Sequence, residues 1–305
     1  MWLLNANTQE LRTFYGEVPE YAILSHTWGE DEITLQDLQK INGNIPTTNN
    51  EVNRLRNSEG FTKITECCKQ ALKDELQWVW VDTCCIDKTN SVELSKAINS
   101  MFQWYQGSQV CYAVLTDVPD DDPVENSDSR FRASRWFTRG WTLQELLAPS
   151  IVIFYGQGWT KLGDRKSLVE VISAIAKIPT RCLSDNQYRQ EACIAQKMSW
   201  ASNRETTRTE DIAYCLLGLF GVNMPLLYGE GTKAFLRLQE ELARTKPDDS
   251  LLVWKAALVS GQLLDDFGGF APSPKAFSQS GDVVCYGDST LSLASLGLQL
   301  ETFRY

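Results

Sequence analysis

The chain has 305 residues, 43% of them hydrophobic, which is enough apolar material for one large domain or two modest ones. Its formal net charge of −10 disfavours sequence-independent binding to nucleic acid, which needs a basic surface, and docking on anionic membranes. No apolar run reaches the roughly 18 residues of a membrane span, and the N-terminus lacks the basic and apolar regions of a signal peptide.

In the first half of the chain, apolar and β-branched runs predict four strands, at residues 21–25, 78–82, 110–116 and 151–155. Helical periodicity predicts three helices between them, at 59–76, 91–106 and 137–148, the last stopped by Pro149. The acidic stretch 117–128 indicates a solvated loop. This alternation predicts an α/β fold of the flavodoxin-like kind, a mostly parallel sheet with helices on both faces.

The second half of the chain has a different pattern. Helices are predicted at 166–177, 190–202, 208–221 and 230–244, followed by strands at 251–254, 282–286 and 296–302. We therefore expect a sheet core at 1–160, a helical subdomain at 161–245, and a small β-rich extension at 246–305 that packs on the preceding helices. Trp254 is its predicted buried anchor, and a strand pattern at Tyr305 leaves room for the natural chain to continue.

The sequence contains a single histidine and nine cysteines, at positions 67, 68, 84, 85, 111, 182, 193, 215 and 285. An odd number of cysteines in a large chain without an export signal predicts a reducing, cytoplasmic location. Because no C-x-x-C spacing occurs, we expect no bound metal and no disulfide between Cys84 and Cys85.

Three polar segments are predicted to converge at the carboxyl end of the sheet, where open α/β sheets bind ligands. They are SHTWGED at 25–31, DTCCIDK at 82–88 and RGWTLQEL at 139–146. Candidate binding residues in these segments are Ser25, His26, Trp28, Gly29, Asp82, Cys85, Asp87, Arg139 and Trp141.

The same segments carry a family resemblance. The blocks YAILSHTWG at 21–29, VDTCCIDK at 81–88 and RGWTLQEL at 139–146 resemble the signature blocks of the fungal HET (heterokaryon incompatibility) domain. Further similar blocks lie at 204–208, 211–220 and 224–231, so the resemblance covers about residues 1–245. It implies a cytosolic domain that triggers regulated cell death after non-self recognition, often fused to a sensor domain.

A second resemblance concerns chemistry. The block WTLQE at 141–145 is similar to the W-x-x-x-E block of TIR domains, whose glutamate cleaves NAD at the nicotinamide–ribose bond. Carried over, Glu145 is the catalytic carboxylate, and NAD is a substrate rather than a bound cofactor. A carboxylate suits this reaction because it stabilises an oxocarbenium-like transition state, while nicotinamide leaves as a neutral base.

The binding residues have expected roles in the same reaction. Trp28 or Trp141 would stack on the cationic pyridinium ring, and backbone N–H groups near Gly29 would meet the diphosphate. We place Glu145 in the last turn of its helix, where the helix dipole disfavours a carboxylate, so that a functional reason for its presence is indicated.

Each of these residues also has a structural explanation. Glu145 is alternatively a surface glutamate beside a core Trp141, and Arg139 either binds a phosphate or pairs with the acidic loop. His26 suggests a nucleophile pair with Cys84 or Cys85, although a structural histidine is commoner. Asp87 is expected to cap the next helix.

Three functions remain open from the sequence. The first is an NAD-cleaving cell-death effector that uses Glu145 and self-associates. The second is a non-enzymatic signalling domain that kills by assembling with itself and with partners. The third is a cysteine hydrolase that uses His26 with Cys84 or Cys85.

Overall fold

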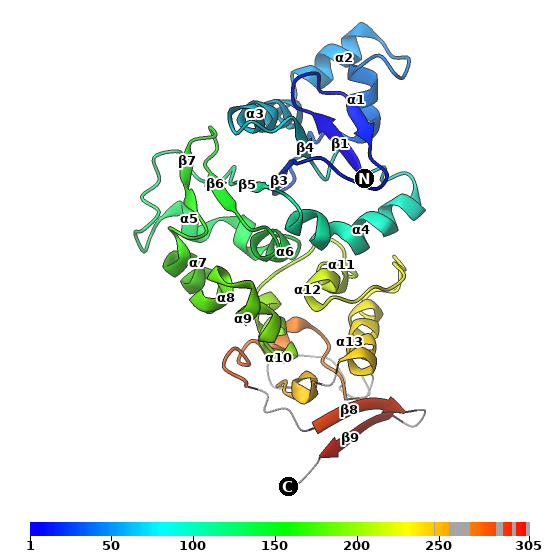
Figure 1. Cartoon of the computed structure of the whole chain (residues 1–305), viewed down its shortest axis with the longest axis vertical. Coiled ribbons are helices and arrows are strands. Elements are labelled where there is room, and N and C mark those ends of the chain that lie inside the picture. The colour runs from blue at the N-terminus through cyan, green and yellow to red at the C-terminus, as the bar shows by residue number, and fades with distance from the viewer. Residues whose placement is uncertain (247, 256–268, 285–288, 295–296, 303–305) are drawn as a thin grey trace. The chain divides into compact units, whose positions relative to one another are not determined.

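The computed structural model describes residues 1–246, 248–255, 269–284, 289–294 and 297–302. The chain divides into two compact units (Figure 1). The first unit consists of Met1–Trp136 and Ala148–Arg165, and the second of Phe137–Leu147 and Lys166–Tyr305.

The first unit contains a seven-stranded sheet and the helices that connect its strands. Its elements are β1 (Trp2–Asn5), β2 (Leu11–Thr13), β3 (Ala22–His26), α1 (Leu35–Ile41), α2 (Asn49–Arg56), α3 (Glu59–Lys73), β4 (Trp78–Trp80), α4 (Ser91–Gln106), β5 (Val110–Val114), α5 (Arg130–Ala133), β6 (Val152–Tyr155) and β7 (Lys161–Asp164). A 3-10 helix, η1, spans Arg135–Thr138.

The sheet has the order β2-β1-β4-β3-β5-β6-β7, and its four central strands are parallel. These are the four predicted strands, so the predicted α/β fold with a largely parallel sheet is confirmed. Their spatial order, second-first-third-fourth along the chain, is that of flavodoxin-like sheets. All residues of β3 and β5 are buried, as continuous apolar runs predict.

Both edges of the sheet carry antiparallel strands that the sequence patterns did not predict. β1 pairs with β2 and β4, and β7 pairs with β6. These strands are only three or four residues long. Strands this short have too few residues to show a clear alternation of polar and apolar side chains.

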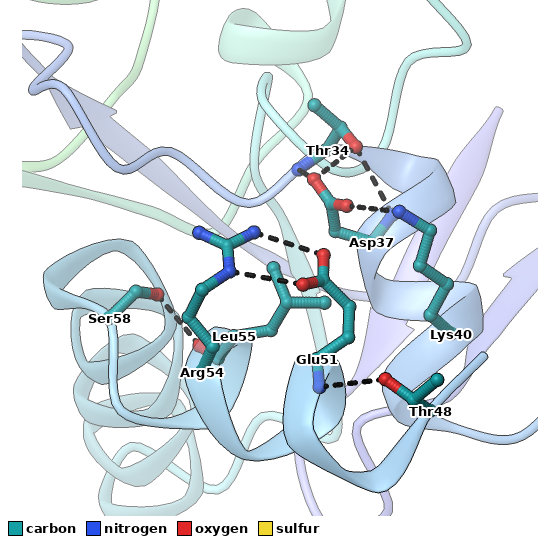
Figure 2. A network of polar contacts seen from close by, with 8 residues as sticks. All are labelled: Thr34, Asp37, Lys40, Thr48, Glu51, Arg54, Leu55 and Ser58. Carbon is teal, nitrogen blue, oxygen red and sulfur yellow. Dashed lines mark hydrogen bonds and ion pairs between the residues drawn. The ribbon is translucent and has the colours of Figure 1, made fainter.

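Each of the three helices between β3 and β4 begins with a side-chain cap, and Figure 2 shows the caps of α1 and α2. Thr34 and Asp37 form a capping box at α1, and Thr48 accepts the backbone N–H of Glu51 at α2. Ser58 caps α3 by accepting the N–H of Phe61. Such caps satisfy backbone donors that a helix leaves unpaired, each contributing about 1 kcal/mol.

The acidic loop after β5 is more ordered than its composition predicted. The carboxylate of Asp117 accepts the N–H of Arg135, and that of Asp122 accepts the N–H groups of Arg130 and Phe131. Asp120 accepts the N–H of Gly158. These carboxylates satisfy backbone donors at the starts of short helices and in a neighbouring turn.

The second unit is mostly helical. Its elements are α6 (Thr142–Leu147), α7 (Val169–Ala176), α8 (Thr180–Ser184), α9 (Asn186–Glu191), α10 (Ile194–Ala201), α11 (Asp211–Tyr214), α12 (Leu217–Phe220), α13 (Lys233–Thr245), η2 (Asp249–Leu252), η5 (Pro274–Phe277), β8 (Ser289–Ala294) and β9 (Gly297–Thr302). β8 and β9 form an antiparallel pair, and β8 contacts α13 (Figure 1). No helix in the described part of the chain is long and apolar enough to cross a membrane.

One predicted helix of this unit begins later than expected. The helix predicted at 137–148 begins only at Thr142, because the backbone before it pairs with Glu205. The N–H of Gly140 bonds to the Glu205 carbonyl at 2.8 Å, and the Glu205 N–H bonds to the Thr138 carbonyl at 2.7 Å. Backbone groups engaged in such a bridge are not available to a helix.

The prediction for the extension was only partly right. The strand predicted at 251–254 is wrong, because Asp248 accepts the N–H of Ser250 and begins the 3-10 turn η2. Trp254 is only half-buried and donates its indole N–H to the Gly269 carbonyl, so it is not a buried anchor. Residues 282–284 are irregular, and 285–286 lie outside the described residues. The strand predicted at 296–302 is confirmed as β9.

Candidate functional site

The strand order reverses between β3 and β5, because β4 lies on one side of β3 and β5 on the other. In open α/β sheets this switch point forms the ligand crevice beyond the carboxyl ends of the strands. His26 is the last residue of β3, and the segment from Thr27 to Glu32 leaves the sheet at this point. The residues from Trp28 to Asp31 are exposed.

His26 lies between two carboxylates. Its Nε2 is 3.5 Å from Oε2 of Glu32, and its Nδ1 is 3.8 Å from Oδ1 of Asp82. The imidazole is 1% exposed, and its Nε2, like the two facing carboxylate oxygens, has no hydrogen-bond partner. Buried polar atoms without partners are costly, so this arrangement is a candidate for function.

Glu32 is held by two further donors. Its Oε1 accepts the backbone N–H of Gly29 at 2.7 Å and the ammonium of Lys63, on α3, at 2.5 Å. Burial alone would raise the pKa of Glu32, but the close approach of His26 and the charge and hydrogen bond of Lys63 lower it to about 2. The carboxylate is therefore ionised at neutral pH.

Neither Glu32 nor Lys63 was among the residues predicted from the sequence. Glu32 is the last of three acidic residues in a row, which resembles a solvated loop, and Lys63 lies on a different helix. Nothing in the sequence pattern distinguishes Glu32 from Glu30.

Trp28, in the segment after β3, is also held by specific contacts. Its indole N–H donates to Oδ2 of Asp82 at 2.7 Å, although 52% of the side chain is exposed. The Lys88 ammonium lies 3.7 Å from the centre of the indole ring. From the sequence, we expect the pyridinium ring of NAD to stack on Trp28 or Trp141. In this structure the Lys88 ammonium lies over the indole of Trp28, at a distance typical of a cation–π contact.

Two other predicted binding residues are engaged in structural contacts. Ser25 is fully buried, and its hydroxyl accepts the indole N–H of Trp136 at 2.8 Å. The Asp87 carboxylate accepts the N–H of Thr89 at 3.0 Å and the amide of Gln36 at 2.8 Å, so it shapes the turn before α4. Asn90, not Asp87, caps that helix.

The cysteines after β4 are poorly suited to nucleophilic chemistry. Cys84 is fully buried, and a hydrogen bond with Cys85 together with burial raises the pKa of the Cys84 thiol well above its usual value. Cys85 is 2% exposed, and its sulfur accepts the N–H of Val81. Because the thiolate is the reactive form, these environments disfavour a cysteine hydrolase.

The remaining predicted residues, Arg139, Trp141 and Glu145, belong to the second unit. Glu145 is on α6, as predicted, but it is 7% exposed and not a surface glutamate. It also lies in the first turn of this six-residue helix. Because α6 begins later than predicted and has only six residues, Glu145 lies in both its first and its last turn, and the helix dipole no longer argues against a carboxylate there.

Arg204 organises the start of α6. Its Nη1 donates to the Arg139 carbonyl at 2.8 Å and to the Thr142 hydroxyl at 2.9 Å. Burial lowers the pKa of Arg204 to about 10, while the negative charge of Glu145 acts in the opposite direction. Arg204 is thus a buried cation whose charged form is stabilised by the negative charge of Glu145. The Arg139 side chain donates to the Thr207 hydroxyl at 3.0 Å.

Trp141 is half-buried and donates its indole N–H to Asp211 at 3.3 Å. The same carboxylate accepts the Tyr228 hydroxyl at 3.0 Å. The loop that contains Tyr228 is held by Glu210, which accepts the N–H groups of Gly229 and Gly231. Two of the sequence blocks that resemble the HET domain, at 211–220 and 224–231, therefore support the Trp141 end of α6.

Within the described residues, no group of three or more His, Cys, Asp or Glu side chains is arranged to hold a metal ion. The eight cysteines in this part of the chain are free thiols.

Four parallel central strands in the order β4-β3-β5-β6, joined by helices, are the arrangement of a doubly wound α/β domain. Residues 21–129 match the family described as Heterokaryon incompatibility protein (HET). The chain is 43% identical over 244 residues to the vegetative incompatibility protein HET-E-1 of Podospora anserina. That alignment covers 78% of this chain, whereas the chain spans only 17% of the length of that relative. No solved structure matches the chain.

The chain therefore belongs to the heterokaryon incompatibility (HET) family, as its sequence blocks predicted.

Proposed function

We propose that this chain acts in vegetative incompatibility as a cytoplasmic cell-death effector that hydrolyses NAD at the nicotinamide–ribose bond. Glu145 is the proposed catalytic carboxylate. The incompatibility role draws on the similarity to HET-E-1, which is a much longer protein. Further segments that sense non-self and promote self-association are proposed to act with this domain.

The observation that carries the enzymatic proposal is the buried polar cluster beyond β3. The cluster of His26, Glu32 and Asp82 includes unpartnered polar atoms at the switch point of a parallel sheet, where folds of this kind bind nucleotides. A sequence that needed only to fold would have no reason to bury polar atoms there without partners.

The proposed chemistry needs one negative charge. The bond between ribose C1′ and the pyridinium nitrogen breaks, its electron pair stays with nicotinamide, and the sugar gains oxocarbenium character that a carboxylate stabilises. Water then adds at C1′ and releases a proton. Glu145 supplies the carboxylate, and Arg204 and Thr142 fix the start of its helix.

The test is the release of nicotinamide by the purified chain at high protein concentration. Glu145→Gln removes the charge and is expected to slow the reaction by roughly 10²–10³. Glu170→Gln is the matched control, because Glu170 is an exposed glutamate in the first turn of α7, and the rate should be unchanged. Unchanged nicotinamide release by a folded Glu145→Gln protein would refute the role of this residue. Cell killing without any loss of NAD would favour the non-enzymatic alternative, killing by assembly.

A further inference from the structure

Three nitrogen groups face the Glu32 carboxylate, and two of them, the Gly29 N–H and the Lys63 ammonium, donate hydrogen bonds to it. They are the backbone N–H of Gly29 at 2.7 Å, the Lys63 ammonium at 2.5 Å and the imidazole Nε2 of His26 at 3.5 Å. A backbone N–H next to a glycine together with a lysine is the donor set that recurs in phosphate-binding loops. In this structure the donors bind the carboxylate of Glu32, which belongs to the same loop as Gly29.

We propose that His26, the Gly29 N–H and Lys63 form a phosphate-binding cradle, and that Glu32 occupies it until the diphosphate of a nucleotide displaces the carboxylate. This inference rests on the proposed function, because it names the groups that would hold the nucleotide there.

The cradle itself is fixed by close packing. A Cβ on Gly60 would lie 2.2 Å from the backbone oxygen of Asp31, so the first turn of α3 is pressed against the loop just before Glu32. Lys63, in the following part of the same helix, is thereby brought to the carboxylate. The Lys63 side chain is 11% exposed, which limits competition from water.

The Glu32 side chain, in contrast, lies next to exposed residues and can leave the cradle towards solvent. It is 13% exposed, and the neighbouring residues from Trp28 to Asp31 are exposed. Its Oε2 faces His26 without forming a hydrogen bond, so only the bonds of Oε1 need to be exchanged. An incoming phosphate oxygen would regain bonds from both Gly29 and Lys63 and would also reach His26.

Besides Glu32, the negative groups nearby are Asp82 and the exposed Glu30 and Asp31 of the same loop. Asp82 lies on the opposite, Nδ1 side of the imidazole and is bonded to Trp28. The charge of Lys88, over the Trp28 ring, opposes that of Asp82. Glu32 is the carboxylate that accepts the hydrogen bonds of Gly29 and Lys63, so it competes directly with an anion for the cradle.

The test measures binding of inorganic phosphate, pyrophosphate and ADP-ribose to the full chain by calorimetry. Glu32→Ala is expected to bind pyrophosphate about ten-fold or more tightly than the unmodified chain, because a charged competitor for the donors is gone. Adding Lys63→Met to Glu32→Ala should abolish the gain. Glu30→Ala, which removes an exposed negative charge from the same loop, should change affinity less than about two-fold.

Comparing the affinities for the three ligands shows which kind of anion the cradle prefers. Tighter binding of ADP-ribose than of pyrophosphate would identify a nucleotide, whereas equal gains would identify a general phosphate site. If Glu32→Ala does not fold, Glu32→Gln keeps the shape, and pyrophosphate should then raise its melting temperature more than that of the unmodified chain. A folded Glu32 variant with no gain in either assay would overturn the cradle. Absence of nicotinamide release would instead count only against the proposed hydrolysis, since none of these ligands is cleaved in the binding assay.

Discussion

The environment of Glu32 changes the acidity of an ordinary side chain. A glutamate titrates near pH 4.5 in the unfolded chain, whereas contacts with His26 and Lys63 lower the pKa of Glu32 to about 2 against the effect of burial. A carboxyl group with a lowered pKa in the folded state stabilises that state above its unfolded pKa. The stabilisation is lost as the pH falls from about 4.5 towards 2.

This linkage gives a pH prediction. Replacing Glu32 by Gln should destabilise the chain at pH 7, and the difference from the unmodified chain should shrink by about 1 kcal/mol at pH 3.5, after allowing for solvent screening. Urea unfolding of both proteins at the two pH values measures it. Glu30→Gln, at an exposed position, should show no such pH dependence. A difference that is the same at both pH values would contradict the lowered pKa.

Glu145 is a second glutamate whose environment differs from what the sequence indicated. One interpretation of the sequence made it a surface glutamate, but it is 7% exposed and its charge raises the pKa of the buried Arg204. Glu145→Gln should therefore cost more than the small amount expected of a surface change. Folding of this variant has to be measured alongside its activity.

At the scale of elements, α3 decides where the cluster beyond β3 lies. Its Ser58 cap fixes the start of the helix, its first turn packs against the Asp31 backbone, and its Lys63 binds Glu32. The Ser58 hydroxyl also donates to the Leu55 carbonyl at the end of α2 (Figure 2). The apolar periodicity of 59–76 predicted the helix, but it did not predict which polar residue of the helix would matter.

Gly60→Ala tests the close packing of α3 against the loop. Within a helix, Ala is normally more stable than Gly by about 1 kcal/mol. Here the added Cβ would meet the Asp31 oxygen, so the sign should reverse, with a loss of about 1–3 kcal/mol in urea unfolding. Thr62→Ala, at an exposed position of the same helix, should stay within about 0.5 kcal/mol. A stabilised Gly60→Ala protein would show that the helix does not press on the loop.

On the scale of the whole molecule, the segment after α13 completes the second unit. Asp248 and Ser250 accept the N–H groups of Ile194 and Ala195 at the start of α10. The buried Gln239 exchanges two hydrogen bonds with the backbone of Ala271, each 2.8 Å long. Apolar side chains from this segment, including Leu251 and Phe277, are fully buried.

A chain that ends at Thr245 is therefore expected to be strongly destabilised. It leaves the buried amide of Gln239 without its Ala271 partner, removes the Asp248 and Ser250 bonds to the start of α10 and exposes apolar surface. We expect a fall in melting temperature of more than about 5 °C, or insolubility. Ser250→Ala in the full chain removes only one cap bond and should cost about 1 kcal/mol. An unchanged melting temperature for the shortened chain would show that the segment contributes nothing to the fold.

The sequence by itself determined the central sheet and the family. Buried parallel strands are continuous apolar runs, amphipathic helices repeat every 3.6 residues, and the HET blocks are contiguous, so all three are local signals. Local signals also placed His26, Trp28, Gly29 and Asp82 at one edge of the sheet, where the structure brings them together.

Only the tertiary structure decided the rest. The short edge strands depend on pairing with distant segments, and the late start of α6 depends on a backbone bridge to Glu205. The same is true of Glu32 and Lys63, whose contact requires α3 to pack against the loop at Gly60. Whether a charged side chain is solvated or buried beside a partner is set by what folds over it, and no local pattern in the chain records that.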